Sequence, residues 1–255
     1  MPKGVYAAAS AMFVENQALD VAARNLAHAT TTGYRRETAF RQGFDQALAD
    51  QGRTGGVKGN GGTGILSQGS TFSFQEGSRE TTSGTYDLAI SGEGFFRVTK
   101  PDGNTLLTRA GHFQTDPKGR LVTPEGFLVQ GQGGSITIPG DAEGVTIDPK
   151  GRVSVATTTA GVRTEQVVDQ IRLVRVERPE AMRAINGQYF DPGDAPQSDA
   201  PAQVHQGSLE KSNVEPLREL VDMIAIQRRY DAAQKAMREQ TTTGQGFNEL
   251  LRGNA

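Results

Sequence analysis

Apolar residues at the start of the chain recur with the period of a helix. Four of them are spaced by seven residues, with alanines in the neighbouring positions: Val5, Met12, Leu19 and Leu26. A stripe this narrow is typical of a helix that packs on one or two other helices. It predicts a helix over residues 4–29, about 40 Å long at about 1.5 Å per residue. Docking of an amphipathic helix on its own domain is the alternative.

The helical pattern ends in the polar run NLAHATTTGYRR (25–36), and residues 38–70 have the composition of a linker. The stretch QGRTGGVKGNGGTG (51–64) is so poor in apolar side chains that it cannot bury enough surface to order itself alone. Gly59, Gly61 and Gly64 fit G-x-G-x-x-G. A dinucleotide-binding fingerprint also requires a strand before the motif and a helix after it, and neither is expected here.

Residues 71–190 switch to short runs of β-branched and aromatic residues, which are typical of strands. Turn signals separate the runs, and Asp-Pro-Lys-Gly-Arg occurs twice, at 116–120 and 148–152. In such a turn Asp accepts a local hydrogen bond, Pro presets φ and Gly takes a positive φ. No helical pattern interrupts this region, so a βαβ sheet is not expected.

A helical period returns near the C-terminus. Ser212 and Glu215 have the spacing of a capping box, with Asn213 as a rival cap, and Pro216 suits a first helical turn. Two apolar stripes follow, one formed by Leu217, Leu220, Val221 and Ile224 and the other by Met223, Ile226, Tyr230, Ala233 and Met237. They predict a helix over about 214–240 with more than one packing partner.

The predicted fold class is therefore α+β, with a mainly-β central body between two long terminal helices. The expected ranges are 1–37 for the N-terminal helix, 38–70 for a Gly-rich linker, 71–190 for the β-rich domain, 191–211 for a second linker and 212–255 for the C-terminal helix. Pairing of the two helices in a coiled-coil-like layer is the simplest way to bury both apolar stripes.

Composition narrows the possible functions. Hydrophobic residues make up 35% of the 255 residues and glycine is frequent, with 32 copies, which suits a turn-rich β body with a modest core. Lys and Arg (27) nearly balance Asp and Glu (29), so the basic footprint of a nucleic-acid binder is missing. The chain has no cysteine, which excludes disulfides and thiolate sites. We also expect no cleaved signal peptide and no membrane span.

The sequence offers no clear catalytic, cofactor or metal site, and we predict none. His28, His112 and His205 lack a second ligand at metal-binding spacing, and no nucleophile elbow or phosphate-binding loop is present. Asp87 and Glu93 are the one conceivable pair of hydrolase carboxylates, and acids beside turns are more often solvated or turn-forming.

Three segments resemble the bacterial flagellar rod and hook family of axial proteins. They are ALDVAARNLAHATTTGYRRE (18–37), YDLAISGEGFFRV (86–98) with LTRAGHFQTDPKGRLVTPEGFLVQG (107–131), and GSLEKSNVEPLRELVDMIAIQRRYDAAQKAM (207–237). The residues that match the family motifs are Asn25, Leu26, Ala27, Gly33, Tyr34, Asp87, Gly92, Gly94, Phe95, Phe96, Arg109, Gly111, Gly119, Glu210, Ser212, Asn213 and Val214. The length and GGSITIP (133–139) most resemble the proximal-rod member, with the distal-rod member as the close rival.

The resemblance implies a structural subunit of the basal-body rod, a helical tube that transmits torque from motor to hook. The implied partners are other copies of the chain, other rod and hook axial proteins, and the flagellar type III export apparatus. The chain would reach the periplasmic rod without a cleaved signal peptide. The residues that we expect to mediate assembly are Val5, Met12, Leu19, Leu26, Leu217, Leu220, Val221, Ile224, Tyr230 and Met237.

Two rival functions stay open at this point. One is a secreted β-rich enzyme that acts on carbohydrate or peptidoglycan, which would need a carboxylate pair in one cleft. The other is an export-associated binding module that uses its helices as a clamp and forms a complex of fixed stoichiometry. Neither accounts as simply for matched helices at both ends of the chain.

Overall fold

The computed structural model describes residues 3–43, 65–159 and 162–252, and it divides into two compact units. The helical unit contains the described residues within 1–27, 37–71 and 215–255. The β body contains residues 28–36 and 72–214. The chain therefore passes between the units four times, after residues 27, 36, 71 and 214. The predicted α+β class, with most of the structure in strands and a helix near each end, is confirmed.

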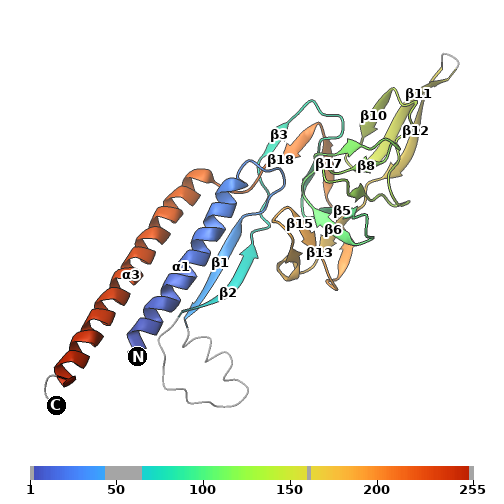
Figure 1. The fold of residues 1–255 in the computed structure, drawn as a ribbon. Coiled ribbons are helices and arrows are strands. Elements are labelled where there is room, and N and C mark those ends of the chain that lie inside the picture. Colours follow the sequence, from blue (N-terminus) through green and yellow to red (C-terminus); the bar gives the residue numbers. More distant parts are fainter. Residues whose placement is uncertain (1–2, 44–64, 160–161, 253–255) are drawn as a thin grey trace. The chain divides into compact units, whose positions relative to one another are not determined.

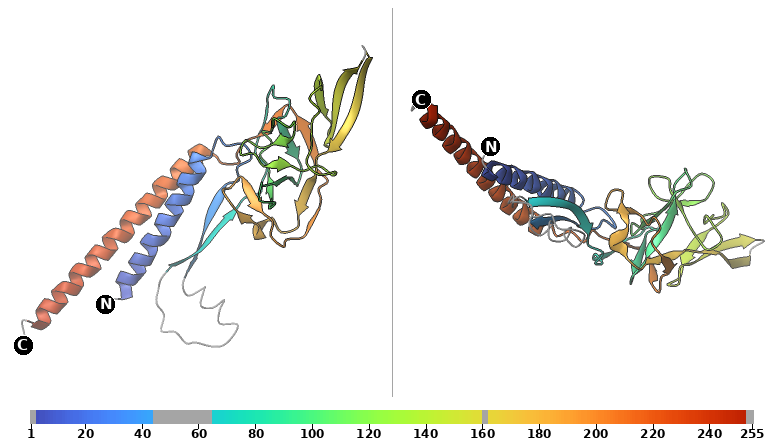
Figure 2. Two further views of the ribbon diagram at one scale, coloured as in Figure 1. Left: turned by 45° about the vertical axis from the view of Figure 1, so that its right-hand side comes forward. Right: turned by 90° about the horizontal axis from the view of Figure 1, so that it is seen from below.

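The helical unit consists of two helices and a two-stranded ribbon. Helix α1 (Lys3–Ala27) and helix α3 (Pro216–Arg252) lie side by side, and β1 (Glu37–Gly43), which pairs with β2 (Ile65–Phe72), contacts α1 (Figure 1). The two further views show the same arrangement (Figure 2). Both strands of the ribbon fall partly within 38–70, where we expected a linker, and the Gly-rich stretch 51–64 lies outside the described residues.

The contact between α1 and α3 is made largely by small residues. Ala18 and Ala22 of α1 are buried with Ile226 of α3, and Leu19 and Met223 pack against them. Alanine side chains allow two helix backbones to approach closely, because they add little bulk between them. Within the described residues, neither helix has the apolar length that crossing a membrane requires.

The β body is built from short strands joined by tight turns. A nine-stranded sheet has β5 near its middle, between β6 and β9, and β13 also pairs with β5. β10, β11 and β12 form a three-stranded sheet, and the pairs β4–β17 and β3–β18 complete the body. Parts of the range 191–211, expected as linker, are the strands β16–β18.

The bounds of its elements are β3 (Arg79–Thr81), β4 (Leu88–Ser91), β5 (Phe95–Thr99), β6 (Thr105–Thr108), β7 (Gln114–Thr115), β8 (Leu121–Val122), β9 (Leu128–Val129), β10 (Gly144–Ile147), β11 (Arg152–Thr159), β12 (Val162–Gln170), β13 (Leu173–Val176), the 3-10 helix η2 (Pro179–Ala181), β14 (Arg183–Ala184), β15 (Tyr189–Asp191), β16 (Gln197–Asp199), β17 (Gln203–Gln206) and β18 (Ser208–Glu210).

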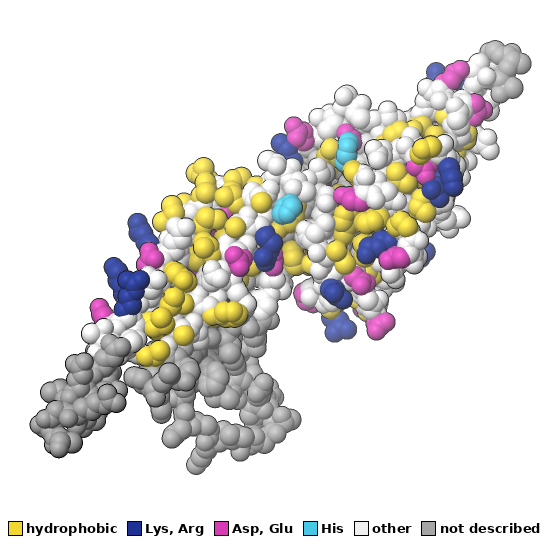
Figure 3. All heavy atoms as spheres, in the orientation of Figure 1, with side chains coloured by type: hydrophobic (Ala, Val, Ile, Leu, Met, Phe, Trp, Pro, Cys, Tyr) yellow, Lys and Arg dark blue, Asp and Glu magenta, His cyan; other side chains and the backbone are white. Residues whose placement is uncertain are grey.

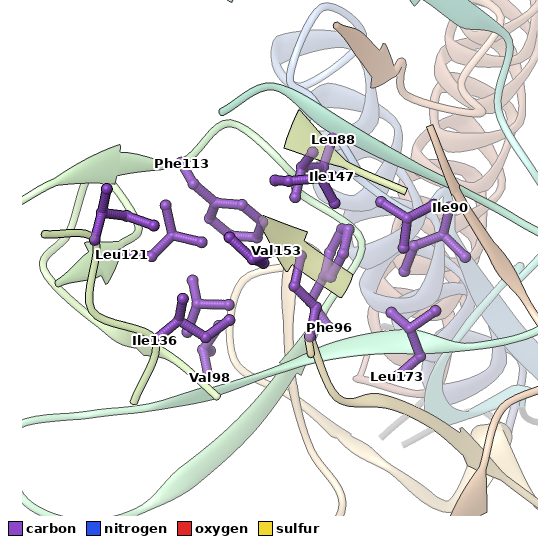
Figure 4. Packing of buried hydrophobic residues seen from close by; sticks show 14 of the residues in the cluster. Leu88, Ile90, Phe96, Val98, Phe113, Leu121, Ile136, Ile147, Val153 and Leu173 are labelled. Carbon is purple, nitrogen blue, oxygen red and sulfur yellow. The ribbon is translucent and has the colours of Figure 1, made fainter. Parts of the chain in front are cut away.

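Two apolar clusters form the core of the β body, one on each face of β5. Phe96 and Val98 enter the larger cluster, shown in Figure 4, while Phe95 enters the smaller one with Leu107 and Phe190. This alternation follows from the period of two along a strand. Each face of β5 is therefore covered by an apolar cluster.

The two Asp-Pro-Lys-Gly-Arg segments fold into turns with matching hydrogen bonds. In each turn the Asp Oδ1 accepts from two backbone N–H groups, at 2.9 Å, and the Asp Oδ2 accepts from the Arg Nε, at 2.8 Å for Asp116 and 2.7 Å for Asp148. Gly119 and Gly151 have φ values of 75° and 79°. The turn chemistry predicted from the sequence is thus confirmed at both sites.

Candidate functional site: a buried ion cluster and an exposed helix face

Motif residues that lie far apart in the sequence meet at the carboxylate of Glu210 in the β body. Arg35 Nη2 donates to Glu210 Oε1 at 2.7 Å, and Arg109 Nη1 donates to Oε2 at 3.1 Å. The backbone N–H of Gly77 also donates to Oε1, at 2.9 Å, and that of Gly33 donates to the Glu210 carbonyl, at 2.8 Å. Glu210 therefore joins the N-terminal, central and C-terminal motif segments at one point.

This ion cluster is almost fully removed from solvent. The exposed fraction of the side chain is 0% for Arg35 and 1% for Glu210. Burial lowers the pKa of Arg109 from its usual value, and Arg35 adds to this, while the Glu210 carboxylate opposes it. Two guanidinium groups thus share one buried carboxylate, and among the described residues only the half-exposed Glu76, 4.0 Å from Arg109 Nη1, adds a second negative charge.

A cluster of this kind makes Glu210 critical for the β body. Arg35 Nε and Nη1 and Arg109 Nε find no hydrogen-bond acceptor among the described residues. Removing one partner of a buried ion pair costs far more than removing a surface charge, because the remaining charge stays uncompensated. Loss of Glu210 would leave two buried cations facing each other.

The motif glycines beside the cluster are required by close backbone approach. Gly33 has a φ of 68°, and a Cβ at this position would overlap the backbone nitrogen of Ala110. A Cβ on Gly111 would overlap the carbonyl oxygen of Leu88. Glycine is the residue that tolerates both conditions, because it has no Cβ and takes positive φ at little cost.

The side chain of Asn213 lies next to the cluster and binds two other backbone segments. Its Oδ1 accepts from the Arg36 N–H at 2.6 Å, and its Nδ2 donates to the carbonyls of Ser73 and Gln75, both at 2.9 Å. Its backbone N–H donates to the Tyr34 carbonyl at 3.4 Å. The amide group thus uses one acceptor and both donors on the backbone of other segments.

The remaining motif residues divide between the units. Asn25, near the end of α1, makes two hydrogen bonds with the backbone of Glu37. Asn25 Nδ2 donates to the Glu37 carbonyl at 2.7 Å, and the Glu37 N–H donates to Asn25 Oδ1 at 2.9 Å. Leu26 is half-buried and Ala27 is exposed. In the β body, Gly92 has a φ of 97° and its carbonyl accepts from Arg109 Nη2. Those that are buried in the β body are Tyr34, Asp87, Gly94, Phe95, Phe96, Ser212 and Val214.

The predicted assembly residues of α1 and α3 have very different environments. On α3 the first stripe is exposed, with fractions of 80% for Leu217, 44% for Leu220, 62% for Val221 and 52% for Ile224. At about 100° per residue, Leu217 and Val221 lie across the helix from Met223 and Ile226, which contact α1. We call the group Leu217, Leu220, Val221 and Ile224 the exposed stripe. Hydrophobic side chains are visible at the surface over the helices in Figure 3.

The four heptad positions of α1 are not its most buried ones. Leu19 packs at the contact with α3, and all four are half-buried: Val5, Met12, Leu19 and Leu26. Deeper burial falls on a neighbouring row with the same helical spacing, namely Val14, Ala18, Val21 and Ala22. Tyr230 and Met237 of α3 are half-buried, and Phe13 of α1 is 61% exposed. The structure therefore brings Leu19, but not the exposed stripe, into the contact between α1 and α3.

Asp87 and Glu93, the conceivable hydrolase pair, have unrelated partners. Asp87 is buried and accepts from Thr82 Oγ1 at 2.6 Å, with His112 Nδ1 at 2.7 Å from its other oxygen. Glu93 is 75% exposed and pairs with Arg175 at 2.9 Å. In the part of the chain that the structure describes, no group of three His, Cys, Asp or Glu residues could hold a metal ion.

Sequence reasoning missed the roles of Arg35 and Gly187. Arg35 matches the N-terminal family motif, but nothing in the sequence indicated that its side chain forms a buried ion pair with Glu210. Gly187 accepts from the Arg35 N–H at 2.9 Å, and a Cβ there would overlap the Tyr34 ring. The signal available was an arginine next to a tyrosine in an otherwise polar motif, and it does not identify a partner 175 residues away.

The chain is similar in sequence to flagellar axial proteins. The family described as "Flagellar hook protein FlgE/F/G D1 domain" matches residues 89–155, and "Flagellar basal body rod FlgEFG protein C-terminal" matches 205–243. A flagellar basal-body rod protein FlgF of Caulobacter vibrioides is 34% identical, over 93% of each chain. The FlgG proteins of C. vibrioides and Agrobacterium fabrum are 32% and 30% identical, over 90% of this chain and 92% of theirs.

Proposed function

Since this chain belongs to the family of flagellar basal-body rod proteins, we propose that it is built into the rod through the exposed stripe of α3. It is a structural subunit of the flagellar basal body. The names of the relatives lend no support to the hydrolase alternative, and the carboxylates on which it depended have separate partners.

The exposed stripe is the single observation that carries this proposal. Its four apolar side chains are between 44% and 80% exposed, although they belong to a helix whose opposite side is packed on α1. Fully burying a side chain such as Leu, Val or Ile contributes roughly 1.5–3 kcal/mol. A neighbouring subunit that covers the stripe would therefore gain several such contributions, without any change in the β body.

Covering the stripe would turn the α1–α3 pair into part of a coiled-coil-like layer shared by many subunits. Repetition of one head-to-tail contact gives an open helical structure, as a tube requires. An isolated helix is marginal in water, so contact with neighbours would also stabilise the ends of the chain. Torque would then pass through many such contacts loaded together.

The expected partners follow from the same assembly. They are other copies of this chain and other rod and hook axial proteins. The family resemblance also implies passage through the flagellar type III export apparatus to the periplasmic rod, without a cleaved signal peptide. Helices that become fully stable only on assembly would suit that route, because export requires an unfolded chain.

A charge placed in the exposed stripe tests the proposal. The gene for this chain would be deleted from a flagellated bacterium, and the Val221→Asp variant would be supplied in its place. Ala236→Asp, at an exposed position on the flank of the same helix, is the control. We expect Val221→Asp to leave the thermal unfolding of the purified chain close to wild type and to abolish filaments beyond the inner membrane. The control should restore filaments. Normal filament numbers with Val221→Asp would refute assembly through this stripe.

A further inference from the structure

The four passages of the chain between the units are the only covalent routes by which force can travel from the helices to the β body. On the side of the β body they begin at His28, Arg36, Phe72 and Val214. This follows from the order of the chain and is independent of how the units are arranged. Load that travels along the backbone of a rod subunit therefore passes through these segments.

Three of the passages are tied to one another by Asn213. Its side chain accepts from the Arg36 N–H and donates to the carbonyls of Ser73 and Gln75, and its own N–H donates to Tyr34. The Ser73 N–H in turn donates to the Arg36 carbonyl at 2.9 Å. The segments before residue 37, after residue 71 and before residue 215 are thus joined by one side chain.

The buried ion cluster around Glu210 also holds the segments that contain Arg35 and Gly77. Glu210 lies three residues before Asn213, holds Arg35 through its carboxylate, and accepts from the N–H groups of Gly33 and Gly77. The fourth passage, at His28, is held by stacking of its ring on Tyr34, with the ring centroids 4.8 Å apart. On the side of the β body, all four passages are therefore held by the connected contacts of Asn213, Glu210 and Tyr34.

We propose that Asn213 acts as a clamp that makes these passages a single joint, so that load and unfolding from the helices enter the β body together instead of strand by strand. The inference rests on the proposed function, since it concerns how a rod subunit carries force. Contacts that must break at the same time resist more than contacts that break in sequence. Asn213 is a positioning residue in this scheme, because it acts through the backbone segments that it joins.

Hydrogen exchange of the purified full-length chain tests the clamp without any assembly. Asn213→Ala removes the acceptor of the Arg36 amide directly. If the passages act together, the amides of Gly33, Ser73 and Gly77, which do not bond to the Asn213 side chain, should also exchange faster, by about tenfold. Asn104→Ala, in an exposed turn, is the control and should change none of these amides. Acceleration of the Arg36 amide alone would overturn the clamp.

A conservative variant keeps the test informative if Asn213→Ala fails to fold. Asn213→Asp retains an acceptor for the Arg36 amide but cannot donate to the carbonyls of Ser73 and Gln75. The clamp predicts that Ser73 and Gly77 amides accelerate in this variant while the Arg36 amide is largely preserved. Wild-type rates at Ser73 and Gly77 would refute it.

Swimming in media of rising viscosity gives the functional measurement. Cells with Asn213→Asp should build filaments at wild-type numbers and lose them, or stop swimming, at a lower viscosity than cells with Asn104→Ala. Equal behaviour at every viscosity would overturn the clamp. Failure of the wild-type chain itself to restore filaments would instead reject the proposed function, so the two failures are distinguishable.

Discussion

The β body and the helical unit treat the same kinds of apolar side chain in opposite ways. In the β body Phe96, Val98 and Leu107 have an exposed fraction of 0%, whereas Leu217 and Val221 of α3 are exposed by 80% and 62%. The β body therefore buries its two apolar clusters within one chain, although Val162, Val167 and Ile185 on its surface are between 50% and 65% exposed. The helical unit satisfies only the side of α3 that faces α1, which is what a subunit needs if its last contacts come from neighbours.

The polar groups follow the same division. The β body buries an ion cluster, with Arg35 and Glu210 almost inaccessible to solvent. The helical unit has partly exposed pairs instead, such as Arg24 with Glu37 at 3.0 Å and Arg229 with Glu15 at 3.1 Å. In these two pairs the arginine is 52% and 47% exposed while the carboxylate is only 9% and 8% exposed, so water screens them more than it screens the Arg35–Glu210 pair.

The largest expected effect separates the two regions by a core deletion. Phe96→Ala should cost the β body about 3–5 kcal/mol, because it removes a fully buried ring from the larger cluster. Leu217→Ala should change the unfolding free energy by less than about 0.5 kcal/mol, since its side chain is already in water. Urea unfolding of the purified, unassembled chain measures both changes in unfolding free energy. The transition of the β body reports on Phe96→Ala, and the loss of helical circular-dichroism signal reports on Leu217→Ala. A large cost for Leu217→Ala would show that the stripe is covered in the free chain.

The ion cluster gives the second prediction. Glu210→Gln keeps the shape of the side chain but leaves Arg35 without its carboxylate and Arg109 with only the half-exposed Glu76, and we expect a loss of about 3–5 kcal/mol. Glu93→Gln removes an exposed partner of Arg175 and should cost about 0–1 kcal/mol. Both are measured by urea unfolding at neutral pH. Equal costs for the two variants would mean that the buried cluster is compensated in another way.

Local signals in the sequence were enough for the elements that depend on local chemistry. The period of seven around Leu19 predicts α1, and Asp-Pro-Lys-Gly-Arg predicts two turns that the structure confirms. The apolar stripe after Pro216 predicts α3, although the structure extends that helix to Arg252. Each of these signals lies within a few residues of the structure that it produces.

Features that depend on distant partners could not be predicted in the same way. β12 was missed because residues 162–167 are exposed on both faces, so no alternation marks the strand, and its pairing with β11 supplies the structure. The β-branched run 135–138 has the composition of a strand but makes only isolated bridges, although Ile136 is buried. The link between Arg35 and Glu210 spans 175 residues, and periodicity holds no information about it.

The smallest predicted effect concerns the acid stability of the two Asp-Pro-Lys-Gly-Arg turns. Burial would raise the pKa of Asp116, but hydrogen bonds from the Arg120 side chain and from the backbone N–H groups of Arg120 and Lys118 outweigh it and lower the pKa. The pKa of Asp148 is lowered in the same way. A carboxyl group whose pKa is lower in the folded state stabilises the fold above its unfolded pKa of about 4, and the contribution is lost as the pH falls through the folded pKa.

Acid should therefore lower the unfolding free energy of the β body through these turns. The exposed stripe has no titratable side chain, so acid should not change its exposure. Asp116→Asn removes the contribution of the carboxylate at every pH, so the variant should lose less stability than wild type between pH 6 and pH 3. Asp148→Asn should behave alike, because the two turns have matching hydrogen bonds. Asp141→Asn, at an exposed turn position, controls for the loss of one negative charge. The urea midpoint of the β-body transition at the two pH values is the measurement. If Asp116→Asn and Asp141→Asn lose equal stability over this range, the hydrogen bonds of the turn do not make folding depend on the protonation of Asp116. The acid sensitivity of the β body would then come from other groups.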